Sequence, residues 1–200
     1  MNKYLKVLVE DIHSTSIATI GNDGHPQTRI IDMMYQDEKG VYFLTAKGKE
    51  FYRQLMEQKY VAISATKDKI GISLRGKIEV AEKEYVDILF DHNPYMKEIY
   101  PGNTRDAIVV FRLYKAQGEY FDITNPSHIV RETIVVGDTK VVHCGYVVEP
   151  NCIGCKICYS VCPQKCIDIS TKPVIILQNH CLHCGRCLEA CPQRAIRKLG

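Results

Sequence analysis

The stretch CIGCKICYSVCP, residues 152–163, carries four cysteines separated by two, two and three residues, and it ends on a proline. The same arrangement returns in CLHCGRCLEACP, residues 181–192, with each cysteine and the proline displaced by 29 positions. The repeat predicts two equivalent centres. The eight repeated cysteines are Cys152, Cys155, Cys158, Cys162, Cys181, Cys184, Cys187 and Cys191.

Metal binding explains these thiols better than disulfides do. Nine of the ten cysteines lie from Cys152 onward, and a disulfide framework is not expected in a reducing compartment. Three thiolates spaced two residues apart suit three iron corners of an iron–sulfur cube, and the fourth corner then needs a ligand from elsewhere. Structural zinc is the alternative. Its usual pattern is two C-x2-C pairs separated by a longer gap, and two complete four-cysteine runs do not fit that pattern.

Residues 145–198 resemble bacterial two-cluster ferredoxins on the strength of these two runs. In such ferredoxins the cysteine before the proline ligates the opposite cluster. The resemblance therefore implies two [4Fe-4S] clusters with crossed ligand sets. One set is Cys152, Cys155, Cys158 and Cys191, and the other is Cys181, Cys184, Cys187 and Cys162. Cys166 lies 29 positions before Ala195, so we expect it to be a small buried residue without a ligand role.

Charge and hydropathy narrow the function classes. Residues 141–200 hold seven Lys or Arg and three Asp or Glu, a surplus that two thiolate-bound clusters would offset. We therefore expect no nucleic-acid partner. A nucleic-acid-binding face would interleave lysine and arginine with aromatic side chains, and the only aromatic residues in this segment are Tyr146 and Tyr159. The start of the chain lacks the apolar run of a signal peptide or membrane span, so we expect a cytoplasmic protein with no membrane partner.

The preceding residues read as a β-rich domain. The turn signal at Asp23 and Gly24 predicts a hairpin between strands at 16–21 and 27–36. Further strands are expected at 40–46, 60–66, 70–80, 106–116 and 118–124, with helices at 3–12, 48–58 and 82–93. Many antiparallel strands with few helices are typical of a barrel.

Residues 5–125 resemble the pyridoxamine 5'-phosphate oxidase-like, FMN-binding split-barrel family through GHPQTRIIDM, YFLTAKGKEFYRQL, ISLRGKIEV and GEYFDI, in that order. In this family an arginine-carrying strand lines the flavin, a threonine and basic residues hold the phosphate, and two subunits share each site. Carried over, the strand residues are Arg29, Ile30 and Ile31, the phosphate residues are Thr45, Lys47 and Lys49, and the further contacts are Gln54, Ser73 and Leu74.

Physical chemistry supports the phosphate position, because a helix N-terminus after Gly48 favours an anion. Lys47 and Lys49 also have a plainer interpretation as a solvated turn, and Arg29 as an outward-facing strand residue. The arginine-containing tail that closes over the vitamin substrate in this family is replaced here by the cysteine-rich segment. The chain is therefore not expected to be a true pyridoxamine phosphate oxidase.

Together these features predict a mainly β fold with short helices: a split β-barrel at residues 1–140, then a small α+β two-cluster ferredoxin-like domain at 141–200. We expect a homodimeric, FMN-dependent iron–sulfur oxidoreductase that exchanges electrons with an external donor or acceptor and with a small-molecule substrate. A non-catalytic electron carrier, a redox or flavin-binding sensor, and a haem-binding split barrel are the alternatives.

Overall fold

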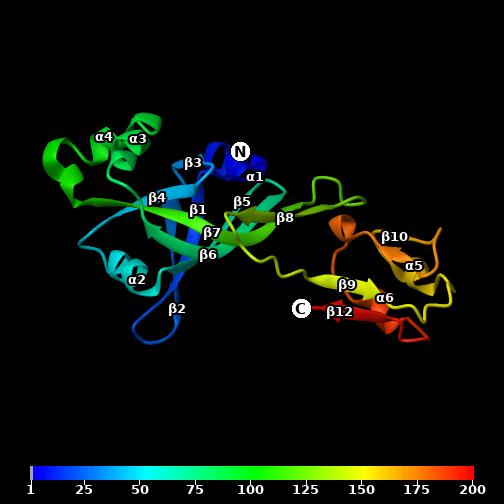
Figure 1. The fold of residues 1–200 in the computed structure, drawn as a ribbon. Coiled ribbons are helices and arrows are strands. Elements are labelled where there is room, and N and C mark those ends of the chain that lie inside the picture. The colour runs from blue at the N-terminus through cyan, green and yellow to red at the C-terminus, as the bar shows by residue number, and fades with distance from the viewer. Residues whose placement is uncertain (1) are drawn as a thin grey trace. The chain divides into compact units, whose positions relative to one another are not determined.

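The computed structural model describes residues 2–200 and divides the chain into two compact units (Figure 1). The first unit runs through Tyr120 and also includes Thr133–Lys140. The second consists of Phe121–Glu132 and Val141–Gly200. No helix within residues 2–200 is long and apolar enough to cross a membrane.

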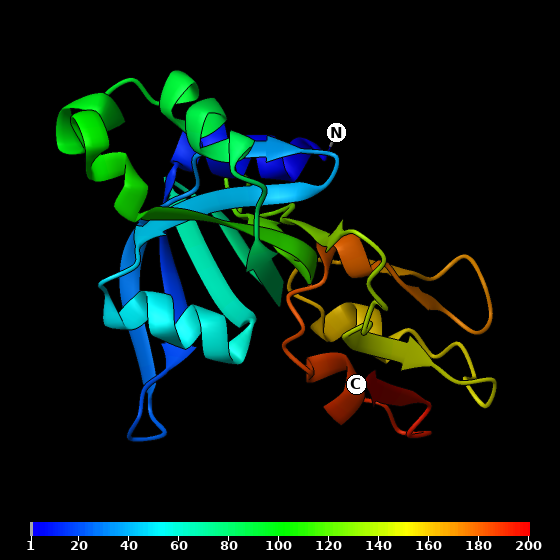
Figure 2. The same ribbon diagram turned by 60° about the vertical axis from the view of Figure 1, so that its left-hand side comes forward.

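An eight-stranded sheet forms the first unit and confirms the predicted mainly β fold. Its strand order is β2-β1-β5-β6-β7-β4-β3, with β8 paired to β7, and the strands curl instead of lying flat (Figure 1, Figure 2). The strands are β1 Ser14–Ile20, β2 Pro26–Asp32, β3 Tyr35–Asp37, β4 Gly40–Ala46, β5 Tyr60–Lys67, β6 Ile70–Val80, β7 Ile108–Asp122 and β8 Val130–Val136.

Alternation of buried and exposed residues explains the sheet. In β1, Thr15, Ile17 and Thr19 are buried while their neighbours along the strand are more exposed, the period-two pattern of a strand with one face in a core. Burying each large apolar side chain contributes about 1.5–3 kcal/mol. β2 pairs with β1 alone among the described strands and so forms an edge of the sheet.

Short helices cover parts of this sheet. The helix α2, Glu50–Gln58, buries Phe51, Gln54 and Leu55, and it begins after Lys49, close to the predicted position. The predicted N-terminal helix is α-helical only over α1, Lys3–Lys6, and continues as a π-helix over Val7–Ile12. The others are α3 Glu84–His92, α4 Met96–Ile99 and a 3-10 helix at Gly102–Ala107.

Two strand predictions are wrong. The single strand expected at 27–36 is divided at Met33 and Met34 into β2 and β3, and β3 pairs with β4. The sequence predicts two closing strands, at 106–116 and 118–124, whereas the structure has one continuous strand, β7. Gly118 lies inside it and does not separate two strands. A Cβ atom at Gly118 would lie 1.8 Å from the carbonyl oxygen of Ser73, so glycine is needed here to let two backbones pass closely.

The second unit repeats itself in structure as it does in sequence. The helices α5, Ile157–Val161, and α6, Arg186–Glu189, begin 29 residues apart, as do the strands β10, Ile167–Asp168, and β12, Ile196–Leu199. β10 pairs with β11, Ile175–Ile176, and β12 pairs with β9, Gly145–Val148. A 3-10 turn at Gln178–His180 completes the unit.

Candidate functional site

The first sulfur pocket lies in the second unit and is lined by Cys152, Cys155, Cys158 and Cys191. Three of these cysteines come from one loop and the start of α5, and the fourth comes from the other repeat, after α6. This is the first of the two crossed sets that the sequence predicts. The structure thus brings the four predicted ligands together, while iron ligation itself stays a prediction.

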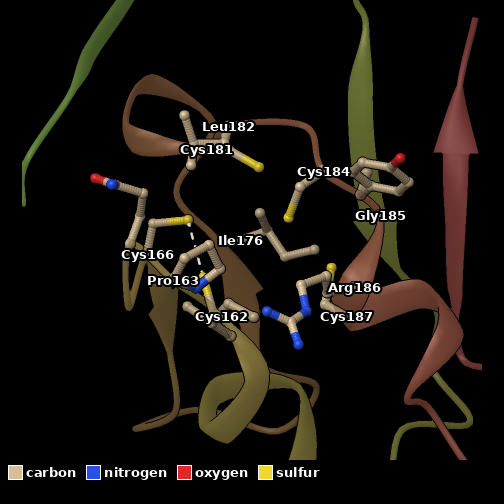
Figure 3. Close-up of a pocket in the computed structure, with 13 residues that line it drawn as sticks. Cys162, Pro163, Cys166, Ile176, Cys181, Leu182, Cys184, Gly185, Arg186 and Cys187 are labelled. Atoms are coloured by element: carbon tan, nitrogen blue, oxygen red, sulfur yellow. Dashed lines mark hydrogen bonds between the residues drawn. The ribbon is translucent and has the colours of Figure 1, made fainter. Parts of the chain in front are cut away.

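The second sulfur pocket is lined by Cys181, Cys184, Cys187 and Cys162, again three from one repeat and one from the other (Figure 3). Ile176 and Pro163 supply apolar lining. The remaining sulfur at this pocket belongs to Cys166, which is buried as predicted and whose Sγ lies 3.6 Å from that of Cys162. Cys144 is exposed and lines neither pocket.

Backbone geometry explains how a short loop can present three thiols to one centre. Residues with left-handed backbone angles occur in both loops and recur at the 29-residue displacement. They are Gly154 and His183, Lys156 and Gly185, and Lys165 and Arg194. Lys156 and Gly185 immediately precede α5 and α6, so each helix begins where its loop reverses direction. Two loops with the same unusual conformations form two pockets of the same kind.

Burial affects the acidity of these thiols in both pockets. It raises the pKa of Cys158, and it raises the pKa of Cys187 to about 11. A hydrogen bond from Cys166 lowers the pKa of Cys181 below the ordinary value of a thiol. Because a thiol must lose its proton to ligate iron, loading of either pocket would release protons.

The thiol donors that line these pockets are those that a cubane cluster requires. Within residues 2–200, no three His, Cys, Asp or Glu side chains come close enough to hold a single metal ion. A cubane instead presents four separate iron corners, each with one thiolate. Each pocket brings together the four cysteines of one crossed set, and the second pocket has Cys166 as a fifth.

The predicted flavin residues lie in the first unit, and two of them, Arg29 and Gln54, are joined by a hydrogen bond. The Arg29 guanidinium on β2 donates to Gln54 Oε1 at 3.1 Å and to Thr19 Oγ1 at 2.6 Å. It also lies over the Phe51 ring, 4.4 Å from the centroid. Burial lowers the pKa of Arg29. The alternative interpretation of Arg29 as an outward-facing residue is therefore wrong, since its side chain points toward α2.

The predicted phosphate residues surround the connection from β4 to α2. Thr45 is 2% exposed, and its Oγ1 has no hydrogen-bond partner among the described residues. Lys47 is exposed and donates from Nζ to the carbonyl of Asp106 at 2.9 Å. Lys49 immediately precedes α2, whose first amides have no side-chain cap. A buried hydroxyl, two lysines and a helix N-terminus fit an anionic group.

The remaining predicted residues fall into two groups. Ile30 and Ser73 end one row across the exposed face of the sheet, which passes through Ser16 on β1 and Ser64 on β5. Leu74 lies on the opposite face and is buried in the core. Ile31 packs against this same core, so neither Ile31 nor Leu74 belongs to the exposed row that holds Ile30 and Ser73. A separate groove of about 540 Å³ is lined by residues from the C-terminal end of α2 and from β5, β6 and β7, among them Met56, Tyr60 and Tyr114.

Sequence reasoning missed a third contribution to the second unit, the hairpin tip formed by residues 121–132. It consists of the end of β7, the connecting turn and the start of β8. Its Arg131 donates from Nε to the carbonyl of Cys181 at 3.1 Å. No spacing rule links Arg131 to a cysteine 50 positions away.

Two family models match the chain. The model for pyridoxamine 5'-phosphate oxidase matches residues 1–118. The model for a 4Fe-4S dicluster domain matches residues 151–195. The resemblances to the split-barrel family and to a ferredoxin-like domain are thereby confirmed. No curated protein matches the chain.

Solved structures match the fold of the first unit. A NimC/NimA family protein from Clostridium acetobutylicum is 20% identical, with a TM-score of 0.57 over 67% of this chain and 92% of its own. A pyridoxinephosphate oxidase family protein related to general stress protein 26, also from Clostridium acetobutylicum, is 18% identical, with a TM-score of 0.53 over 67% and 93%.

PhzG from Burkholderia lata, solved in complex with tetrahydrophenazine-1-carboxylic acid, is 16% identical, with a TM-score of 0.50 over 68% and 89%. At these identities the likeness extends to the fold. Since the family model covers more than half of the sequence, the chain belongs to the pyridoxamine 5'-phosphate oxidase family, and it carries a 4Fe-4S ferredoxin-like domain after its split barrel.

Proposed function

We propose that the protein is an FMN-dependent iron–sulfur oxidoreductase that holds two [4Fe-4S] clusters. The observation that carries the proposal is the crossed gathering of the eight repeated cysteines into two pockets, four to each, in a chain whose other domain has a flavin-binding fold. Such clusters carry one electron at a time. FMN, when bound, exchanges electrons singly with a cluster and in pairs with an organic molecule.

In the proposed flavin site, this chain's own residues position and neutralise the cofactor. Thr45 would donate its unpartnered hydroxyl to the phosphate, and Lys47 and Lys49 would balance its charge at the start of α2. Arg29 is held against α2 by Gln54 and so has little freedom to turn away. Since β2 is an edge strand, its outer backbone groups are available to the flavin ring.

A homodimer is part of the proposal, because the family shares each flavin site between two subunits. The exposed face of the sheet supports it. Ile20 is 47% exposed, Ile30 69% and Tyr60 46%, on neighbouring strands. A second copy of the chain would cover this apolar surface. Light scattering should give twice the chain mass, and a monomer holding FMN at one equivalent would contradict the shared site.

The alternative functions are distinguished by whether a small molecule is turned over and by the absorption spectrum. A non-catalytic carrier or redox sensor would reduce its cofactors without turning over any small molecule, and a haem-binding split barrel would give a Soret band. We favour an oxidoreductase because the chain combines one-electron centres with a flavin-binding fold. The electron donor or acceptor and the substrate are external, and cysteine usage favours a cytoplasmic site of action.

Anaerobic purification with cofactor analysis tests the proposal. We expect about eight iron and eight sulfide per chain, as two cubanes require. We also expect extraction to release FMN at one equivalent. Zinc without sulfide would contradict the proposed clusters. Haem in the barrel, or a barrel without any cofactor, would contradict the proposed FMN site.

A further inference from the structure

The hairpin tip, residues 121–132, packs within the second unit around one buried residue, Ile129, which is 2% exposed. The Ile129 amide donates to Gln164 Oε1 at 3.2 Å, and its carbonyl accepts from His180 Nδ1 at 2.8 Å. Gln164 Nε2 in turn donates to the carbonyl of Pro126 at 2.8 Å. These bonds hold the tip against the chain that flanks the second pocket.

The internal repeat gives this arrangement a built-in comparison. Displaced by 29 positions, His180 corresponds to Asn151 and Gln164 to Gln193. Beside the first pocket this pair is joined directly, because Asn151 Nδ2 donates to the carbonyl of Gln193 at 3.1 Å. Beside the second pocket Ile129 of the hairpin tip bridges His180 and Gln164 instead. The tip therefore breaks the symmetry of the two pockets on one side.

The tip also brings a positive charge to the second pocket. Arg131 donates from Nε to the carbonyl of Cys181, a predicted ligand, at 3.1 Å. Its guanidinium lies over the Phe121 ring, 4.7 Å from the centroid, and the side chain is half-buried. Partial burial weakens screening by water, so a charge held there acts more strongly on a neighbouring centre than an exposed one does.

Each pocket is lined by one positively charged residue of its own repeat, so these residues alone do not give the two pockets different charges. Lys156 lines the first pocket and Arg186 lines the second. Arg131 is an addition from outside the repeat. A cluster becomes more negative when it accepts an electron, and a nearby fixed cation stabilises that reduced state.

We propose that Arg131, fixed by the hairpin tip, is a positioning residue that holds the cluster of the second pocket at a higher reduction potential than it would otherwise have. One electron enters the cluster on reduction, and the guanidinium keeps its proton throughout. The inference rests on the two clusters of the proposed function and is independent of the flavin. The two clusters then differ in reduction potential, because Arg131 stabilises the reduced state of the cluster in the second pocket.

An anaerobic redox titration with dithionite as reductant, followed by electron paramagnetic resonance, tests this on the purified holoprotein. Arg131→Gln should lower one of the two midpoint potentials and leave the other in place, with iron and sulfide unchanged. Arg131→Lys keeps the charge and should retain most of the wild-type potential. It also serves as the readout if Arg131→Gln loses its cluster.

Arg197→Gln is the matched control. Arg197 lies in β12, its side chain is 60% exposed, and it is paired with Glu149, so its loss should move neither midpoint. Equal shifts of both midpoints in Arg131→Gln, no shift at full iron content, or an Arg131→Lys shift as large as that of the glutamine variant would each overturn the inference. Wild-type protein without about eight irons would instead contradict the proposed two-cluster function.

Discussion

The residues of the sulfur pockets and those of the predicted flavin region are brought together in different ways. Each pocket is assembled from two loops of known spacing, and the four cysteines of one crossed set line it. In the flavin region, Arg29 and Gln54 are bonded to each other, while Thr45 is buried with no hydrogen-bond partner among residues 2–200. Local spacing thus predicts which three cysteines of one loop gather at each pocket, whereas a site spread over a sheet depends on tertiary contacts that spacing does not encode.

The largest expected effect comes from breaking the crossed ligation. Cys162→Ser should lower iron from about eight to about four per chain, because one cubane loses a ligand. Adding Cys181→Ser should remove nothing more, since both residues line the second pocket. Adding Cys152→Ser should remove nearly all the iron, since Cys152 lines the first pocket. Iron and sulfide analysis of the two double variants decides the matter, and the reverse order would establish ligation within each run.

The next effect concerns the flavin region. Replacing Lys47 and Lys49 together by alanine should weaken FMN binding about ten- to a hundredfold, the range expected for lost charge-assisted hydrogen bonds. Riboflavin lacks the phosphate, so its affinity should stay the same. Fluorescence titration of the apoprotein with both flavins measures this, with the exposed Lys69→Ala as the control. Equal losses for FMN and riboflavin would argue against a phosphate site at these lysines.

A smaller effect tests the packing of the barrel itself. Gly118→Ala places a Cβ against the carbonyl of Ser73, and overpacking of this kind costs about 1–3 kcal/mol of unfolding free energy. Gly48→Ala meets no atom within 4 Å and should change stability by less than about 0.5 kcal/mol. Urea unfolding of both apoproteins compares them. Similar midpoints would mean that β6 and β7 can move apart at no cost.

The smallest effect is expected at Cys166. Cys166→Ala should leave iron and sulfide at the wild-type content, because the second pocket has four cysteines without it. Alanine also stands at the corresponding position of the other repeat, Ala195, which is buried to a similar degree. A loss of about half the iron would assign Cys166 a ligand role in place of one of the four.

Particular residues show how far sequence reasoning reached. The two cysteine runs predict both pockets because the loop conformations needed are local, and the left-handed backbone recurs with the same displacement. The hairpin turn at Asp23 and Gly24 is predicted by a local signal as well, and β1 and β2 flank it, although β2 ends at Asp32. In the turn, and for the three neighbouring cysteines of each pocket, the residues lie close together in the chain. The fourth cysteine of each pocket comes from the other repeat.

Prediction from the sequence failed or stayed open where the deciding contact joins residues that lie far apart along the chain. Gly118 resembles a strand boundary until Ser73 is seen beside it. For Arg29 the sequence leaves two interpretations open, and only the contact with Gln54 of α2 shows which way the side chain faces. Arg131 lies 50 positions before the cysteine that it contacts. Such contacts follow from the folded chain and not from any local pattern.

Rapid mixing tests the central claim, that electrons pass between the clusters and the flavin. The anaerobic holoprotein would be mixed with a one-electron donor while the cluster and flavin absorbances are followed together. We expect flavin reduction to follow cluster reduction within one turnover and to slow strongly in the Cys152→Ser, Cys162→Ser variant. Clusters that stay reduced beside an oxidised flavin in the intact protein would contradict the account.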